Sequence, residues 1–442
     1  MIAFIKKLWR DKRGNALVIA AAAMPLVLGS AGLASDTIQW SLWKRQLQRA
    51  ADSGSIAGVY AIAESGGGRD NVSAAVDRDL SFNSHIAYTT TKTVGAPTSG
   101  PYTADTYAVQ VQLAVQKKLS FSGMFMNFTP TVSATAVATI VPSGHYCVVS
   151  LENTSTTGIT ATGNADVDLG CGMITNSTSL TAAVATGSSD VNASPIAAVG
   201  GIPASTHWAS GTILQPFTMA QPDPFLSINP PASGSYPSGN CPNLTVNSNN
   251  TKSTWTANSD YKAMGTNEYC FGNITIRGTV TFPPNSVIVL DGGSIDFGAQ
   301  SNVTCLGCTF VLTNRSAALS PTIGNVNVNG GATLNLTAPG TAATGDALYY
   351  KGLIMYQDRR AQDGTNASQQ NTLNGNSGST FQGGFYFPSE QVTYNGTTGM
   401  TTVCMQLVAR RVLYSGTMNI SNSCPADSGA SDFTGKKVRL VG

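Results

Sequence analysis

The chain has 442 residues, of which 42% are hydrophobic and 11% are charged, and its net charge is +2. This hydrophobic content can supply a core, which excludes a chain that is disordered by composition. The weak net charge, with no basic patch interleaved with aromatics beyond the N-terminus, argues against a nucleic-acid partner. The length suits two or three domains.

The N-terminal residues predict a membrane anchor. Residues 16–34 carry no charge, and a helix of this length spans ~28 Å, close to a bilayer core. In the tail, residues 1–14, several bases face one acid, Asp11, and such an excess keeps an N-terminus in the cytoplasm. We expect a single-pass protein of the bacterial inner membrane with a cytoplasmic basic tail and its bulk in the periplasm. The alternative is a signal peptide that is cleaved near "GLASD".

A helical pattern continues past the apolar run and predicts one helix over 15–64, ~75 Å long, which Pro25 kinks. Its apolar and small residues recur at helical spacing in the second half, and two glycines four residues apart allow close packing. This stripe must pack against the chain's own head or against a partner helix. The alternative is a plain anchor followed by a separate amphipathic helix. The helix-packing residues are Trp43, Leu47, Ala50, Ala51, Gly54 and Gly58.

The segment "RGNALVIAAAAMPLVLGSAGLASDTIQWSLWKRQLQRAADSGSIAGVYA" resembles the N-terminus of TadE/TadG-like proteins of Flp (Tad) pilus systems. The matching features are Arg13-Gly14-Asn15, Pro25, Asp36 and above all "LQRAADSGSIAG". The resemblance implies a helix like that of type IV pilins. Precursors cut by prepilin peptidase have a glycine before the cut and a glutamate five residues later. Gly14 is the candidate processing site, but Ile19 stands at the glutamate position, so we expect an uncleaved protein.

Residues 65–142 predict a small α+β head that resembles a pilin head. "RDNVSAAVDRDLSFNSH" indicates a short helix, and three Thr- and Val-rich segments with period-2 character indicate strands of a small antiparallel sheet. These segments are "IAYTTTKTV", "YAVQVQLAV" and "TVSATAVATIV". The apolar "FSGMFMNF" between the last two predicts a turn or short helix.

Residues 143–442 predict an all-β right-handed β-helix. "ATGNADVD" and "ATGSSDVN" lie 24 residues apart, as do Cys147 and Cys171, and a repeat of this length is typical of one coil of a solenoid. A Pro-, Ser- and Asn-rich excursion interrupts the coils at about 202–260. This half also resembles the C-terminal domain of many TadG-like proteins. The D-x-S-x-S of the alternative von Willebrand type A domain is absent from the sequence.

The cysteines all follow residue 146, and their even number indicates disulfides in an oxidising compartment. The spacing of about one coil favours Cys147–Cys171 and Cys404–Cys424, since stacked coils lie within disulfide reach. Nearest-neighbour pairing completes the scheme. The eight cysteines are Cys147, Cys171, Cys241, Cys270, Cys305, Cys308, Cys404 and Cys424.

Carboxylates in the repeats are the candidate site residues. Stacking would place Asp166 beside Asp190, and with Asp168 and Asn192 these oxygens could hold Ca²⁺; the competing interpretation is a solvated polar face. Asp291 and Asp296 are further candidates, whereas Asp358, Arg359 and Arg360 indicate a surface ion-pair group. No nucleophile elbow or phosphate loop occurs, so we expect no cofactor and no catalytic residues. The aromatics that are candidates for lining a groove are Trp208, Tyr349, Tyr350, Tyr356 and Tyr394.

These features favour a non-enzymatic, pilin-like component or assembly factor of a Flp/Tad pilus system. Its expected partners are the inner membrane, other pilin-like subunits and pilus-assembly proteins, and it could be incorporated into a surface pilus. One alternative is a surface adhesin that binds a glycan or a substratum. Another is a β-helix enzyme that degrades polysaccharide, which requires clustered acids on one outer sheet.

Overall fold

The computed structural model describes the chain except residues 1–14, 83–91, 364–369, 377, 396–400 and 421–423. The chain forms two compact units. The first unit comprises Met1–Val141 and Lys437–Gly442, and the second unit comprises Pro142–Lys436. The expected second domain continued to the C-terminus. The last residues instead belong to the first unit, where the Val441 amide donates to the Val137 carbonyl at 2.8 Å.

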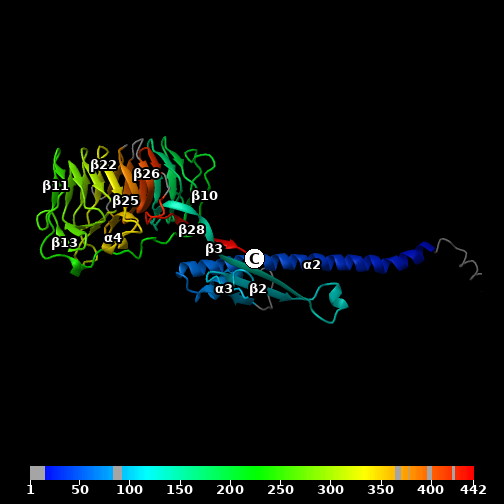
Figure 1. Ribbon diagram of the computed structural model, residues 1–442. Helices are drawn as coiled ribbons and strands as arrows, with labels where there is room; N and C mark the ends of the chain where they lie inside the picture. Colours follow the sequence, from blue (N-terminus) through cyan, green and yellow to red (C-terminus); the bar gives the residue numbers. More distant parts are fainter. Residues whose placement is uncertain (1–14, 83–91, 364–369, 377, 396–400, 421–423) are drawn as a thin grey trace, which may run out of the picture. The chain divides into compact units, whose positions relative to one another are not determined.

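The first unit is built on α2 (Asn15–Glu64), one continuous helix that contains Pro25 (Figure 1). The predicted long helix is therefore confirmed, and the separate amphipathic helix is excluded. α3 (Val72–Phe82) buries two valines at i and i+4. The expected helix at the start of the head is described as far as Phe82, and residues 83–85 of the prediction lie outside the described part.

A small antiparallel sheet completes the first unit. β1 (Lys92–Gly95) pairs with β2 (Val109–Gln116), and β2 pairs with the first part of β3 (Thr131–Ser150). In β2 the sequence VQVQLAVQ alternates, and its valines and Leu113 are buried while three glutamines and Ala114 are not. This period places one face of the sheet on the helices. Most of the expected strand 86–94 lies outside the described residues.

The second unit is an all-β region in which most strands pair in parallel, and its pairings form three rows. Row one begins with the only antiparallel pair of the rows' described strands, β13 with β14, and then continues in parallel. Its order is β13 (Lys262–Gly265), β14 (Glu268–Phe271), β17 (Val287–Asp291), β20 (Thr309–Thr313), β23 (Leu353–Gln357), β25 (Thr380–Asn395), β26 (Thr401–Tyr414), the end of β3, β6 (Gly172–Thr175), β9 (Ile196–Ala198) and β10 (Leu214–Gln215).

Rows two and three use the remaining strands and other parts of β25 and β26. Row two is β11 (Leu244–Val246), β15 (Ile274–Ile276), β18 (Ile295–Phe297), β21 (Val326–Val328), β24 (Asn371–Asn374), β25, β26, β4 (Ile159–Ala161) and β7 (Ala183–Ala185). Row three is β12 (Thr251–Lys252), β16 (Thr279–Thr281), β19 (Asn302–Cys305), β22 (Thr333–Thr337), β25 and β26. A separate sheet contains β27 (Met418–Ile420), β5 (Asp166–Leu169) and β8 (Asp190–Asn192). β28 (Phe433–Leu440) follows β27, and α4 (Gly345–Tyr349) precedes β23.

The rows do not follow chain order from end to end. The chain enters at β3 in the middle of row one, runs outward to β10, and then restarts with β11 at the opposite end (Figure 1). The later strands return towards the middle, where β26 pairs with β3 through Leu407 and Val148. We call this junction the seam. The expected excursion at 202–260 is shorter than predicted, because β10, β11 and β12 pair within the rows and only residues 216–243 connect the two ends.

The 24-residue repeat is visible in the register. Val167 pairs with Val191, both fully buried, while Asp166 pairs with Asp190 on the solvent side. Gly163 and Gly187 both have positive φ, which only glycine adopts readily. A Cβ on Gly187 would lie 2.9 Å from the Gly163 carbonyl oxygen. Both repeats therefore need their glycine for the turn, and Gly187 is also needed for close stacking on Gly163.

Candidate functional site

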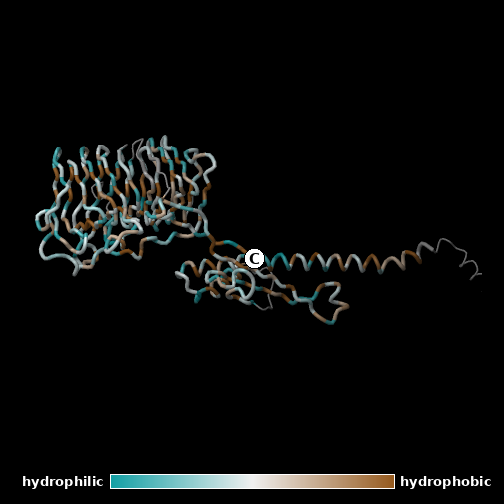
Figure 2. The backbone as a smooth tube through the Cα atoms, in the orientation of Figure 1, coloured by the Kyte–Doolittle hydropathy of each residue, from teal (hydrophilic) through white to brown (hydrophobic). Residues whose placement is uncertain are grey.

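The first half of α2 forms an apolar, solvent-exposed segment. It is the one described helix that is long and apolar enough to cross a membrane, and its apolar window has a mean hydropathy of 1.8. None of that window is buried by the rest of the chain, and hydrophobic colours dominate it in Figure 2. A bilayer would supply the apolar surroundings that the protein itself does not.

The predicted helix-packing stripe lies in the second half of α2 and faces the small sheet and α3. Leu47 and Ala51 are fully buried, and Trp43 nearly so. A Cβ on Gly54 would lie 3.3 Å from Val76 Cγ1, and one on Gly58 would lie 2.8 Å from Val109 Cγ1. The sequence left open whether the stripe packs on the chain's own head or on a partner helix. In the structure it packs on the chain's own head.

Large apolar side chains just before the stripe are exposed and were not singled out in the sequence. Ile38, Trp40 and Leu42 each expose about half of their surface or more. Lys44 and Arg45 follow them, and both are exposed as well. The signal available in the sequence was the presence of large apolar residues outside the stripe, where an amphipathic helix should be polar. Ile38 and Leu42 lie one turn apart on the side away from the stripe, whereas Trp40 lies on the side of the stripe, one turn before Trp43.

The cysteines lie in four pairs at disulfide distance. Cα–Cα separations are 5.8 Å for Cys147 and Cys171, and 4.6 Å for Cys404 and Cys424. The two other pairs have separations of 5.6 and 5.7 Å, within the range that a disulfide requires. These are the pairs of the nearest-neighbour scheme, although their oxidation in the exported protein stays a prediction. The other two pairs are Cys241 with Cys270 and Cys305 with Cys308.

The carboxylates considered for Ca²⁺ lie on β5 and β8. Asp166 and Asp190 face each other in register, and the Asn192 side-chain amide donates to Asp168 Oδ1 at 2.8 Å. That contact uses the donor of Asn192 rather than an oxygen ligand, so it satisfies Asp168 without a cation. The calcium site stays a prediction. Among the described residues, one group of three His, Cys, Asp or Glu ligand atoms clusters closely, Cys241, Cys270 and Asp291, and its two cysteines form one of the pairs above.

Most of the aromatics that were expected to line a groove are buried instead. Tyr356 and Tyr394 are almost fully inaccessible, as are Tyr350 and Trp208. Trp208 and Tyr394 belong to the main apolar core of the second unit, whereas the hydroxyls of Tyr350 and Tyr356 donate to carbonyls of the connecting residues 216–243 at 2.9 and 3.0 Å. Only Tyr349 remains substantially exposed. It lines a pocket with Glu268 and Asp346, where burial and the nearby Asp346 raise the pKa of Glu268 to about 7.

The expected surface ion-pair group is also corrected. Asp358 is buried, where it pairs with Arg360 at 2.7 Å and accepts from Thr313 Oγ1 at 2.8 Å. Arg359 pairs with Asp223 at 3.4 Å and donates to the Ile228 carbonyl at 2.8 Å. The contacts of Arg359 hold the connecting residues 216–243 against row one, which the sequence could not indicate.

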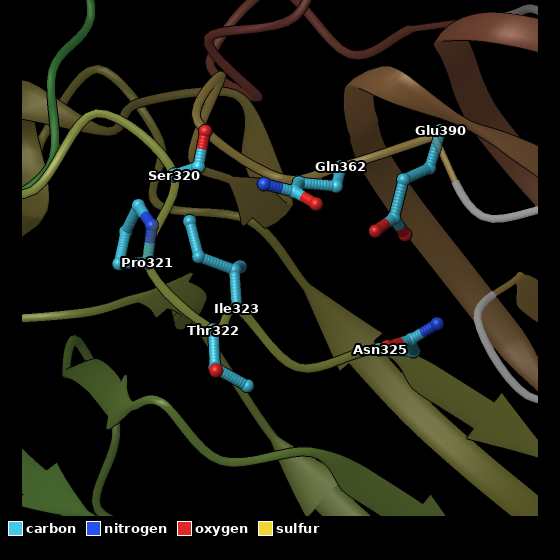
Figure 3. A pocket seen from close by; sticks show the side chains of 7 residues that line it. All are labelled: Ser320, Pro321, Thr322, Ile323, Asn325, Gln362 and Glu390. Atoms are coloured by element: carbon cyan, nitrogen blue, oxygen red, sulfur yellow. The ribbon is translucent and has the colours of Figure 1, made fainter.

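A second pocket has a carboxylate on its floor (Figure 3). Glu390 is buried, and its Oε2 accepts from Gln357 Nε2 at 2.8 Å and from Asn371 Nδ2 at 2.9 Å. Burial raises the pKa of Glu390 to about 7, and Asp363 adds to this effect. The Asn325 amide nitrogen is buried without a partner among the described residues. The remaining lining residues are Ser320, Pro321, Thr322, Ile323 and Gln362.

Glu390 lies at an irregularity of β25. The pairing register with β26 shifts between Phe387 and Gln391, and such bulges redirect side chains. The pocket therefore offers a carboxylate and an amide on its floor, with hydroxyls and a second amide on its rim. The sequence analysis missed Glu390, and "PSEQ" within an apolar strand was the available signal.

The first unit combines a candidate membrane-spanning helix with a small antiparallel sheet that packs on its second half. Residues 14–63 match the family model described as "Putative Flp pilus-assembly TadE/G-like", so the chain carries a TadE/G-like segment and the resemblance stated from the sequence is confirmed. No curated protein and no solved structure matches the chain. Gly14, the processing-site candidate, lies outside the described residues, as does the basic tail.

Proposed function

We propose that the protein is a non-enzymatic, pilin-like component or assembly factor of a Flp/Tad type IV pilus system. The observation that carries this proposal is the family match on residues 14–63, which coincides with the one long helix of the first unit. In the proposal the helix anchors the protein in the inner membrane, its N-terminus is cytoplasmic, and both units lie outside the cytoplasm.

The exposed apolar residues of α2 just before the stripe are the proposed contacts for other pilin-like subunits. The stripe from Trp43 to Gly58 is already covered by the chain's own head. Partner helices would therefore contact Ile38, Trp40 and Leu42, which continue the apolar membrane segment beyond the bilayer.

The second unit is proposed to be a right-handed β-helix. Support comes from three rows of parallel strands in which several neighbours are separated by similar lengths of chain, such as Val287 with Thr309 and Ile274 with Ile295. Parallel crossover connections are right-handed in almost all proteins. In this arrangement β27 and β3 supply successive sides of one coil at the seam, although they lie far apart in the sequence.

Substitutions of the exposed apolar residues of α2 test the proposed role in pilus assembly. Trp40→Ala and Leu42→Ala should lower the yield of pilin-like subunits that co-purify with the protein and should reduce piliation, because they remove apolar contact area. Tyr60→Ala is the matched control, since Tyr60 is exposed at the far end of the same helix. Normal piliation with well-expressed Trp40→Ala and Leu42→Ala protein would refute the contact surface.

Topology is tested separately. A reporter that is active only in the cytoplasm, fused after Gly442, should be silent. Strong reporter activity would reverse the proposed orientation.

The Glu390 pocket favours a second candidate function, glycan binding by an adhesin. A single carboxylate does not favour a divalent cation, which prefers several oxygen ligands, and its charge disfavours anions. Buried acceptors and donors beside Pro321 and Ile323 suit a neutral, hydroxyl-rich ligand. Glu390→Gln retains acceptance from Gln357 and Asn371 but removes the charge, so it should weaken sugar binding on a glycan array without unfolding the protein. Equal binding by the wild type, Glu390→Gln and the control Glu268→Gln would exclude this pocket.

A further inference from the structure

The loop between β2 and β3 lies along α2 on the membrane side of the small sheet. The last paired residues of the hairpin are Gln116 and Thr131. Beyond them, Lys117 Nζ lies 5.6 Å from the centre of the Trp43 ring, and Ser120 Oγ donates to Gln39 Oε1 at 3.2 Å. Later residues of the loop therefore contact earlier residues of the helix.

The loop is fastened where the uncharged run ends. Asp36 is buried, and its carboxylate accepts hydrogen bonds from the amides of Phe121 at 2.9 Å and Ser122 at 2.5 Å. The Phe121 ring lies directly on Gly32, where a Cβ would collide with it. From Trp43 to Gly32 the contacts descend the helix by about 16 Å, into the last residues of the apolar segment.

The tip of this loop exposes large apolar side chains. Met124, Phe125 and Phe128 are 78%, 73% and 63% exposed, and the Phe125 ring packs on Phe121 with centroids 5.3 Å apart. Figure 1 shows the loop beside α2. No described residue of the chain covers these side chains, which are costly to leave in water.

We infer that the loop Lys117–Phe128 is a second membrane contact, in which Met124, Phe125 and Phe128 insert into the outer interface of the bilayer. The inference rests on the proposed function in one respect, the crossing of the membrane by residues 16–34. Contact with Gly32 and Asp36 then fixes the loop at the depth where aromatic side chains concentrate in membrane proteins.

Charge selects the lipid surface over another protein as the occupant. Lys117 and Lys118 begin the loop and are exposed, and Lys44 and Arg45 lie on α2 at the same level, one turn beyond Trp40. Cations beside inserted aromatics suit anionic phospholipid headgroups. The loop would hold the head close to the membrane at a fixed height until the helix is extracted.

Spin labels on the full-length protein in phosphatidylethanolamine–phosphatidylglycerol liposomes test the inference. The probe is a nitroxide on Met124→Cys or Phe128→Cys, exposed positions whose replacement leaves the core intact. Leu33→Cys is the lipid reference, and Ser99→Cys, exposed in a turn of the same unit, is the aqueous reference. We expect the labels at 124 and 128 to be relaxed more by oxygen than by a nickel chelate, as at 33, with the reverse at 99.

The outcomes separate the two proposals. Labels at 124 and 128 that behave like Ser99→Cys, while Leu33→Cys is in lipid, would overturn the loop inference and leave the anchor in place. Labels shielded from both oxygen and nickel would indicate a protein partner and would also overturn it. An aqueous label at 33 would overturn the membrane span together with the loop contact. Asp36→Ala should move the label at 128 towards water without moving the label at 33, because it removes the two hydrogen bonds that fasten the loop.

Discussion

Replacing Gly58 by alanine tests the packing of α2 on its own head. A Cβ there would lie 2.8 Å from Val109 Cγ1 and 3.2 Å from Val76 Cγ2, and overpacking of this kind costs about 1–3 kcal/mol. Alanine gains about 1 kcal/mol over glycine in a helix interior. The net loss at Gly58 is therefore expected to be about 0–2 kcal/mol.

Gly54→Ala is the matched control on the same stripe. Its Cβ would meet Val76 Cγ1 at 3.3 Å, and its other neighbours lie at 3.7 and 3.8 Å, so little overpacking is expected. The gain in helix propensity is common to both variants and cancels in the comparison, which leaves Gly58→Ala less stable than Gly54→Ala by about 1–3 kcal/mol.

Amide hydrogen exchange of the full-length protein in detergent micelles measures this difference. Amides in the second half of α2 should exchange about 5- to 150-fold faster in Gly58→Ala than in Gly54→Ala, since 1.4 kcal/mol corresponds to a factor of ten. Peptides from the second unit serve as the internal reference and should not change. Equal exchange in the two variants would show that Val109 does not pack closely on the helix, and the packing of the stripe on the chain's own head would lose its support.

Burial raises the pKa of Glu390 from 4.5 to about 7, so the folded protein favours the protonated carboxyl group. The contribution of this group to the free energy of unfolding is therefore fully present below pH 4.5 and is lost as the pH rises through 7. Thermal unfolding should therefore show the second unit weakening by up to about 3 kcal/mol between pH 5 and 8, and a Glu390→Gln variant with an unchanged pH slope would contradict this. Glu152 behaves oppositely: burial alone would raise its pKa, but hydrogen bonds from Thr154, Arg410 and Arg411 outweigh this and hold it at about 2, so its contribution is present above pH 4.5 and is lost as the pH falls towards 2. Glu152→Gln should cost about 1–3 kcal/mol, because it removes charge-assisted hydrogen bonds while both arginines keep Asp363 as a second partner, and calorimetry that finds no loss would refute this role. Peptide mapping without reductant should recover all eight cysteines in linked peptides, whereas free thiols in the exported protein would contradict the disulfide prediction.

The sequence alone determined the features that depend on local periodicity. The uncharged run and the helical spacing after it predict α2 without reference to the rest of the chain, because a helix satisfies its backbone within itself. Strand period, the 24-residue repeat and cysteine spacing likewise predict strands that stack with an offset of about one repeat, as seen for Val167 and Val191.

Only the tertiary structure decided how these pieces meet. The seam joins Ser150 to the Arg410 carbonyl at 2.8 Å, and Glu152 is fully buried beside Arg410 and Arg411. Every repeat has similar edges, so periodicity cannot tell which edge meets which across so long a stretch of chain. The choice depends on the few side chains that become buried together. The same reason applies to Phe121 on Gly32: neither residue is unusual in its own segment, and their meeting follows from where the hairpin β2–β3 lies on the helix.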